Sequence, residues 1–396
     1  MIIRKTYLDL MRNSKNRQII KVITGIRRCG KSTVLELFQD ELKIDGVDTD
    51  QIISINFEDP DNDELLTYKK LYNYINSKLL PDKMNYIFLD EIGLVDEWQK
   101  CVDGLFIKKN CDVYVTGSNS YMLSSELATL ISGRYIEIKM LPLSFSEYIS
   151  YVGDGDLARK FRMYLENSSF PYLVDVTDKK QIRSYLDSIY NTVLLNDVVA
   201  RKKIANASIL QSVIKFMFDN IANITSTKKI SDTLTTTGRK ISLPTVEAYI
   251  EALCECFVLY RVNRYDVKGK QHLKTGDKYY LADVGLRTYL LGLSSVDMSK
   301  SLENVVFLEL LRRGYEVYIG KVNDREVDFI AIGDEGTEYY QVSVTTRDEK
   351  TLERELCSLD SISDHNSKYL LTLDEDPMTS YKGIKKINAL EWLIKK

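Results

Sequence analysis

Histidine, tryptophan and proline are scarce in this sequence, and long apolar runs are missing. Two histidines and six scattered cysteines among 396 residues leave no spacing typical of a zinc site. Free thiols suit a reducing compartment, so we expect a cytoplasmic protein. No segment approaches the roughly 18 apolar residues of a membrane-spanning helix. The sequence therefore predicts neither a membrane span nor a signal peptide.

An excess of charge of one sign is also missing. The chain has 54 Lys and Arg against 57 Asp and Glu, a formal net charge of -3. This balance gives no whole-protein argument for binding nucleic acid or a membrane, so any basic surface must be local. With 44% hydrophobic and 28% charged residues, the composition is that of a globular protein long enough for two to four domains.

The most informative stretch is an apolar, β-branched run at residues 19–23 that leads into a glycine-rich loop. Residues 25–32 read G-x-x-x-x-G-K-S, and a helical pattern follows. In this P-loop pattern, backbone N–H groups cradle phosphates, the lysine reaches the β- and γ-phosphates, and the serine hydroxyl ligates Mg²⁺. The alternative is a chance glycine-rich turn between a core strand and a core helix. We expect ATP and Mg²⁺ as cofactors, and the binding residues are Gly25, Arg28, Cys29, Gly30, Lys31, Ser32 and Thr33.

Cys29 lies inside this loop. Loop amides and Lys31 would lower the pKa of its thiol, because both stabilise a thiolate. We therefore predict nucleotide binding that is sensitive to oxidation of Cys29.

A second motif is a hydrophobic strand at residues 86–92 that carries two adjacent carboxylates, the Walker B form. Asp90 would hold Mg²⁺, and Glu91 would orient or deprotonate the attacking water as the catalytic base. Alone, such a stretch is more often a buried strand that ends at a solvated acidic turn. Its order and spacing after the glycine-rich loop favour a nucleotide site.

Two further residues are candidates for sensing or stabilising the γ-phosphate. Asn119 follows a fourth strand at residues 112–116 and would sense the γ-phosphate and position water. Its alternative is an ordinary Gly-Ser-Asn turn. Arg134 precedes a fifth strand at residues 135–139 and would reach a nucleotide in its own subunit or in a neighbour. Its alternative is a solvated surface arginine.

The order of these segments predicts the fold class. Strands at residues 19–23, 51–57, 86–92, 112–116 and 135–139 alternate with helical patterns. This alternation predicts an α/β fold with a parallel sheet, with ligands at the carboxyl ends of the strands.

Several stretches together resemble a known family. They are residues 25–32, residues 88–92 followed by Glu-Trp-Gln at 97–99, and residues 116–120, 132–135 and 141–148. The sequence resembles prokaryotic ATPases of the AAA+ superfamily, in the branch with a C-terminal module of uncharacterised function. The resemblance implies a P-loop sheet of order 5-1-4-3-2, a helical lid, a winged helix and a PD-(D/E)-x-K nuclease-like C-terminal α/β domain. It is also compatible with an oligomer.

We expect four domains. They are an AAA+ P-loop ATPase domain (1–145), a helical lid (146–206), a winged-helix domain (207–293) and a nuclease-like domain (294–396). In the third, helices at 209–221, 229–234 and 243–253 precede two strands at 258–262 and 278–281 joined by a basic loop. This arrangement is typical of a winged helix.

The winged-helix segment is a candidate DNA surface. Residues 228–278 hold ten Lys or Arg and six acidic residues, an excess of four in a chain whose net charge is -3. The alternative is a winged helix that packs or contacts protein, with lysines that merely solvate a loop. Glu247, Glu251 and Glu255 on the last helix would repel phosphates.

The C-terminal segment resembles the nuclease fold only in part. Glu303 and Asp328 match its first two metal-binding positions, where carboxylates hold Mg²⁺ and activate water. The third position fails, because Gln341 and Ser343 stand where the family has an acidic residue and a lysine. We therefore predict a nuclease-like scaffold without nuclease activity.

The leading hypothesis is an ATPase, with Lys31, Glu91, Asn119 and Arg134 as catalytic residues and with Ser32 and Asp90 on Mg²⁺. The alternative is a nucleotide-dependent switch that binds DNA or a protein partner with little turnover. Glu91 favours the ATPase, because a pure binder does not need that base.

Overall fold

The computed structural model describes residues 2–395 apart from 121–130, 132, 154, 193–197, 200–206, 237, 239–240, 270 and 293–296. The chain divides into two compact units. The first comprises Met1–Leu141 with Glu255–Phe257, and the second comprises Pro142–Cys254 with Val258–Lys396. No helix in the described part of the chain is long and apolar enough to cross a membrane.

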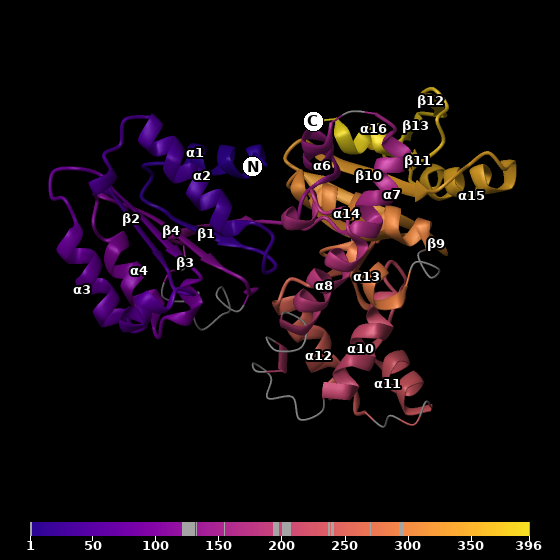
Figure 1. Cartoon of the computed structure of the whole chain (residues 1–396). Helices are drawn as coiled ribbons and strands as arrows, with labels where there is room; N and C mark the ends of the chain where they lie inside the picture. The colour runs from indigo at the N-terminus through magenta and orange to yellow at the C-terminus, as the bar shows by residue number, and fades with distance from the viewer. Residues whose placement is uncertain are drawn as a thin grey trace. The chain divides into compact units, whose positions relative to one another are not determined.

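The first unit is built on a five-stranded sheet whose neighbouring strands are all parallel (Figure 1). The strand order β2-β3-β4-β1-β5 confirms the expected order. The strands are β1 (Ile20–Thr24), β2 (Ile52–Asn56), β3 (Asn85–Asp90), β4 (Cys111–Gly117) and β5 (Tyr135–Lys139). The helices are α1 (Lys5–Ser14), α2 (Lys31–Ile44), α3 (Tyr68–Lys78) and α4 (Trp98–Phe106).

Alternating side chains of the strands cover both faces of this sheet. On one face, Val22, Leu89 and Val115 belong to a buried cluster with Ile75 of α3 and Trp98 of α4. On the other, Phe38 of α2 packs on Tyr114 with a centroid distance of 5.4 Å, and Tyr114 stacks on Phe88 at 4.8 Å. Burial on both faces explains why β1, β3 and β4 are largely apolar. The charged Lys21 of β1 and Asp112 of β4 form a buried ion pair with each other. The carboxyl ends of the strands are left to hold polar residues.

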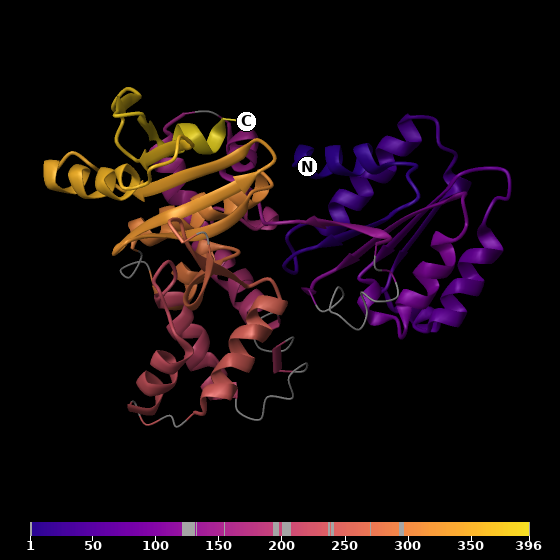
Figure 2. The ribbon, with the colours of Figure 1, turned by 180° about the vertical axis from the view of Figure 1, so that it is seen from behind.

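The second unit combines helices with a larger mixed sheet (Figure 2). Its strand order is β12-β13-β11-β10-β9-β8-β6-β7. The strands are β6 (Leu259–Asp266), β7 (Gln271–Leu281), β8 (Glu316–Val322), β9 (Arg325–Gly333), β10 (Gly336–Ser343), β11 (Ser367–Thr372), β12 (Thr379–Tyr381) and β13 (Ile384–Asn388). The helices are α6 (Phe145–Val152), α7 (Leu157–Asn167), α8 (Lys179–Ile189), α10 (Ala207–Asp219), α11 (Thr227–Thr236), α12 (Leu243–Glu255), α13 (Val284–Leu291), α14 (Met298–Arg312), α15 (Glu349–Asp360) and α16 (Ala389–Ile394).

The predicted wing lies in this sheet. Helices α10, α11 and α12 match the three helices expected there, and β6 and β7 pair as an antiparallel hairpin. Both strands are longer than expected, so most of the expected basic loop at residues 263–277 is strand. However, β6 also pairs with β8 in parallel, so the hairpin forms one edge of the sheet of the C-terminal segment. The sheet therefore crosses the boundary expected between residues 293 and 294. The division into four domains stays a prediction, and parts of the expected lid, residues 193–197 and 200–206, lie outside the described residues.

Candidate functional site

The glycine-rich loop joins the carboxyl end of β1 to the first turn of α2, and two glycines make this connection possible. Gly25 has φ 153°, and a Cβ built on it would lie 2.1 Å from the carbonyl oxygen of Met140. Gly30 precedes α2 in the left-handed region, with φ 102°, where side chains are disfavoured. Because α2 begins at Lys31, the amides of Lys31, Ser32 and Thr33 lie at its positive amino end. The loop is thus suited to an anion such as a phosphate.

Lys31 is buried beside this loop, with 4% of its side chain exposed. Its Nζ donates to the carbonyl of Gly25 at 3.2 Å and lies 3.2 Å from Glu91 Oε1. Burial alone would lower the pKa of the ammonium, but the nearby carboxylates of Glu91 and Asp90 raise it, and the net pKa lies above the usual lysine value. Lys31 therefore stays charged at the position where a phosphate would meet the loop.

Asp90, the last residue of β3, and Glu91, which follows it, both form hydrogen bonds with Thr116 of β4. The Thr116 hydroxyl donates to Asp90 Oδ1 at 2.5 Å and accepts from the Glu91 N–H at 2.8 Å. Glu91 has φ 52°, a left-handed conformation that is uncommon for a residue with a side chain. The turn directs its carboxylate so that Oε1 meets Lys31 and Oε2 accepts from the Ser118 N–H at 3.2 Å.

The structure thus brings together most of the residues predicted for this site. Lys31 and Glu91 are in contact, Asp90 is 7% exposed beside Glu91, and Ser32 and Thr33 follow Lys31 in the first turn of α2. Asn119 is half-buried in the turn after β4, one residue from the Ser118 amide that binds Glu91. Its role as a sensor stays a prediction.

Thr116 was not singled out from the sequence. It lies at the end of an apolar strand, where its side chain reads as an ordinary β-branched strand residue. The strand order could have identified Thr116, because it places the end of β4 directly beside the end of β3.

Arg134 requires a correction. It lies at the amino end of β5, where its carbonyl accepts from the Ile20 N–H at the start of β1. The glycine-rich loop follows the opposite end of β1, about 13 Å away at roughly 3.3 Å per residue. The Arg134 side chain forms an ion pair with Asp103 and lies 5.4 Å from the ring centroid of Phe106. The prediction that Arg134 contacts a nucleotide in its own subunit is therefore wrong. Contact with a nucleotide in a neighbouring subunit stays a prediction.

The expectation for the Cys29 thiol is also wrong. Cys29 is fully buried, and its Sγ donates to the carbonyl of Met140 at 3.6 Å. Burial raises the pKa of the thiol and outweighs the opposite influence of Lys31. The side chain packs in the interior, so only the backbone of Cys29 is left to serve the loop.

A second polar cluster lies in the C-terminal sheet, around Lys278 of β7. Its Nζ is 2.9 Å from Glu303 Oε1, 2.7 Å from Glu326 Oε1 and 3.9 Å from Asp328 Oδ1. Asp328 also accepts from the Val342 N–H at 2.8 Å, and Gln341 Oε1 accepts from the Asp328 N–H at 3.3 Å. Glu303 and Asp328 thus lie in one cluster around Lys278. The lysine that the nuclease fold has at the third position is missing from this sequence, but Lys278, from a strand earlier in the chain, supplies an ammonium to the cluster.

This cluster does not fit a metal ion. The Lys278 ammonium, 4% exposed, lies among the carboxylates where a cation would sit. Among the described residues, no group of three or more His, Cys, Asp or Glu is arranged to hold a metal. Burial, together with Glu303, raises the pKa of Asp328 well above its usual range, which further weakens it as a ligand. Ser343 Oγ donates to the Thr345 carbonyl instead of joining the cluster.

Two family models and two curated proteins match this chain. Residues 17–149 match the model of the AAA domain, and residues 158–297 match a domain of unknown function. An uncharacterised protein of Haemophilus influenzae is 36% identical over 399 residues, covering 100% of this chain and 99% of that protein. An uncharacterised protein of Methanocaldococcus jannaschii is 31% identical over 345 residues, 82% of this chain and 74% of that protein.

Among solved structures, a Walker-type ATPase of Pyrococcus abyssi matches with a TM-score of 0.49 and 15% identity, covering 74% of this chain and 96% of that one.

Proposed function

The chain belongs to the family of the Haemophilus influenzae and Methanocaldococcus jannaschii proteins and carries an AAA domain, and from this premise we propose that it is an ATP hydrolase. The observation that carries the proposal is the contact between Lys31 of the glycine-rich loop and Glu91 at the end of β3. A carboxylate beside the phosphate-binding lysine, with 16% of its side chain exposed, can activate a water against a γ-phosphate.

Each residue has a defined task in this proposal. The amides of the glycine-rich loop and Lys31 bind the β- and γ-phosphates and offset their charge. The γ-phosphate competes with Glu91 for the ammonium of Lys31, since both are anions. Once released from Lys31, the Glu91 carboxylate orients the attacking water and accepts its proton. Thr116 holds the turn that presents Glu91, and Asn119 contacts the γ-phosphate.

Mg²⁺ belongs to the same proposal, because the oxygen donors suit it. The hydroxyl of Ser32 and the carboxylate of Asp90 are hard ligands of the kind that Mg²⁺ prefers. Bound there, the ion would neutralise charge that develops on the phosphates.

We further propose that the nucleotide state is transmitted to the second unit, with its expected lid, winged helix and nuclease-like module, by contacts made and lost at the γ-phosphate. None of the six cysteines, all within the described part of the chain, forms a disulfide, and we propose a reducing cytoplasm as the compartment. Assembly into an oligomer, in which Arg134 would serve a neighbour, remains a separate hypothesis.

The test is phosphate release by the full chain with Mg²⁺ and ATP, with and without duplex DNA. Lys31→Ala should abolish turnover, whereas Lys43→Ala, an exposed lysine on the same helix, should leave it unchanged. Turnover that persists in Lys31→Ala would overturn the proposal.

The second candidate is a nucleotide-dependent switch that binds DNA or a protein with little turnover, and the Lys31–Glu91 ion pair favours it in one respect. The Glu91 carboxylate is paired with Lys31 in the absence of a nucleotide. Nucleotide binding would therefore change the contacts of Glu91 even without hydrolysis. Two of the ten basic residues counted in residues 228–278 are paired with acidic residues: Lys278 is buried among carboxylates, and Arg261 pairs with Asp277. Of the ten Lys and Arg in residues 228–278, Arg239, Lys240 and Lys270 lie outside the described residues, as does the side chain of Lys274.

A further inference from the structure

Arg4, at the amino end of α1, bridges two backbone carbonyls that are distant in sequence. Its side chain is buried, with the residue 3% exposed. Nη1 donates to the carbonyl of Cys29 at 3.0 Å, and Nη2 donates to the carbonyl of Leu141 at 2.8 Å. The planar guanidinium holds both acceptors in fixed geometry, which a lysine ammonium cannot reproduce. One acceptor lies in the glycine-rich loop and the other just beyond β5.

Tyr7, on the first turn of α1, binds the other polar backbone group of Leu141. The Leu141 N–H donates to the Tyr7 hydroxyl at 3.0 Å, and the Arg4 guanidinium lies 4.9 Å from the Tyr7 ring centroid. Tyr7 is 3% exposed, so these contacts are shielded from water. Both the N–H and the C=O of Leu141 are therefore held by side chains of α1.

The residue before Leu141 is bound to the glycine-rich loop as well. The Met140 N–H donates to the Thr24 carbonyl at 2.7 Å, and the Met140 carbonyl accepts from Cys29 Sγ. The same carbonyl lies so close to Gly25 that no side chain fits between them. These contacts join Met140 to the loop, whereas the Arg4 guanidinium joins Leu141 to the backbone of Cys29.

Leu141 is also where the chain leaves the nucleotide-binding unit. The continuous stretch Met1–Leu141, which makes up the first unit together with Glu255–Phe257, ends at Leu141, and Pro142 begins the second unit. Proline has a fixed φ and no N–H, so this peptide has little freedom to absorb a change in the orientation of Leu141.

We propose that Arg4 and Tyr7 form a clamp that transmits phosphate binding at the glycine-rich loop to Leu141, the exit of the chain from the nucleotide-binding unit. Arg4 acts as a positioning residue, because it binds the backbone of the loop and not the nucleotide. A phosphate that orders the loop at Cys29 thereby orders Leu141 through the guanidinium. The inference rests on the proposed nucleotide binding.

Hydrogen exchange of the full chain tests the clamp, with site-resolved rates at the Leu141 amide. The probe is the β,γ-imido analogue of ATP with Mg²⁺. In the wild type, the nucleotide should slow exchange both in residues 25–33 and at Leu141, the latter by about tenfold or more. Arg4→Met should keep the protection of residues 25–33 but reduce the effect at Leu141 to less than about twofold, since the link between the two carbonyls is gone.

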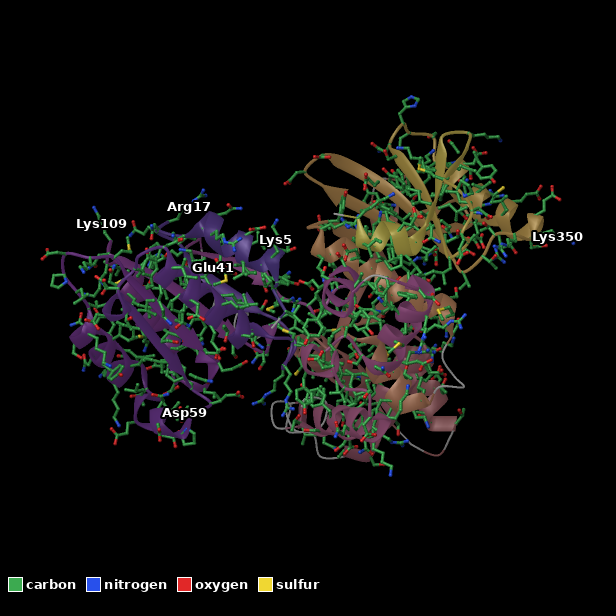
Figure 3. All side chains as sticks on the ribbon, turned by 45° about the horizontal axis from the view of Figure 1, so that its top comes forward. Lys5, Arg17, Glu41, Asp59, Lys109 and Lys350 are labelled. Carbon is green, nitrogen blue, oxygen red and sulfur yellow. The ribbon has the colours of Figure 1, made fainter. Side chains whose placement is uncertain are left out.

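Two further variants control this comparison. Arg4→Lys keeps the positive charge but lacks the two-donor guanidinium that binds both carbonyls, so it should show the same reduced response at Leu141 as Arg4→Met. It replaces Arg4→Met in the experiment if Arg4→Met does not fold. Arg12→Met removes an arginine from α1 whose side chain is 44% exposed and paired with Glu41 of α2. Figure 3 labels Glu41 among the side chains of the first unit. Arg12→Met should retain the wild-type response at Leu141.

The outcomes separate the clamp from the proposed function. Loop protection with wild-type protection at Leu141 in Arg4→Met and Arg4→Lys would overturn the clamp alone. Loop protection in the wild type without any response at Leu141 would do the same. No protection of residues 25–33 in the wild type would overturn nucleotide binding and the clamp together.

Discussion

Replacing Thr116 with valine tests the link between the ends of β3 and β4. Valine keeps the shape of threonine but removes the hydroxyl, which donates to Asp90 and accepts from the Glu91 N–H. Leaving the Glu91 N–H without its acceptor costs about 1–3 kcal/mol, and losing a hydrogen bond to a carboxylate costs about 1.5–3 kcal/mol. Since the two losses are coupled, we expect the first unit to lose about 2–5 kcal/mol of unfolding free energy.

The matched control is Thr116→Ser, which keeps the hydroxyl and removes one buried methyl group, at a cost of about 1 kcal/mol. The chain has two tryptophans, Trp98 in the core of the first unit and Trp392 in the second. In a Trp392→Phe background, the fluorescence of Trp98 reports urea unfolding of the first unit alone. Thr116→Val should also lower ATP turnover, because Glu91 loses the contact that fixes its turn.

The refuting result is equal destabilisation by the two substitutions. If Thr116→Val costs no more than Thr116→Ser, the hydroxyl contributes nothing to the turn, and the positioning of Glu91 must be explained in another way.

The remaining predictions concern the ion pair, the loop and the second unit. Glu91→Gln should tighten ATP binding by about three- to tenfold in calorimetric titration, because Lys31 no longer has a competing carboxylate; unchanged affinity would contradict that competition. Gly25→Ala should abolish ATP binding, since its Cβ would lie 2.1 Å from the Met140 oxygen, whereas Gly46→Ala, with φ +89° and open space, should only lower stability. Burial alone would raise the pKa of Asp374, but hydrogen bonds from Thr345, Thr346 and Lys386 lower it to about 2. The second unit should therefore lose stability as pH falls from about 4 to 2, and Asp374→Asn should flatten that loss in the fluorescence of Trp392, measured in a Trp98→Phe background; an unchanged pH profile would contradict this.

The phosphate-binding part of the site could be read from the sequence because its chemistry depends on local geometry. Gly25 and Gly30 are needed for conformations that other residues resist, and Lys31 follows them at a fixed distance along the chain. Asp90 and Glu91 end an apolar strand, which marks them as residues at the carboxyl edge of a parallel sheet. Such local features can be recognised in a sequence without any knowledge of tertiary contacts.

The residues that were missed or misplaced depend on long-range contacts. Thr116 and Arg4 act on partners in other elements, and a local pattern does not specify which ones. Lys278 enters its cluster because β6 and β7 join the C-terminal sheet, which the expected domain boundary had excluded. Arg134 was misplaced for a different reason. A residue that precedes a parallel strand lies at the amino edge, opposite the ligands, and strand direction alone argues against reach within its own subunit.

The most direct test of the central claim is single-turnover hydrolysis, with the full chain in excess over γ-labelled ATP and Mg²⁺. The account predicts that the wild type converts bound ATP to ADP and phosphate, and that Glu91→Gln binds ATP but keeps it intact. Bound ATP that stays intact on the wild type would contradict hydrolysis and favour the nucleotide switch. Equal conversion by wild type and Glu91→Gln would contradict the role of Glu91.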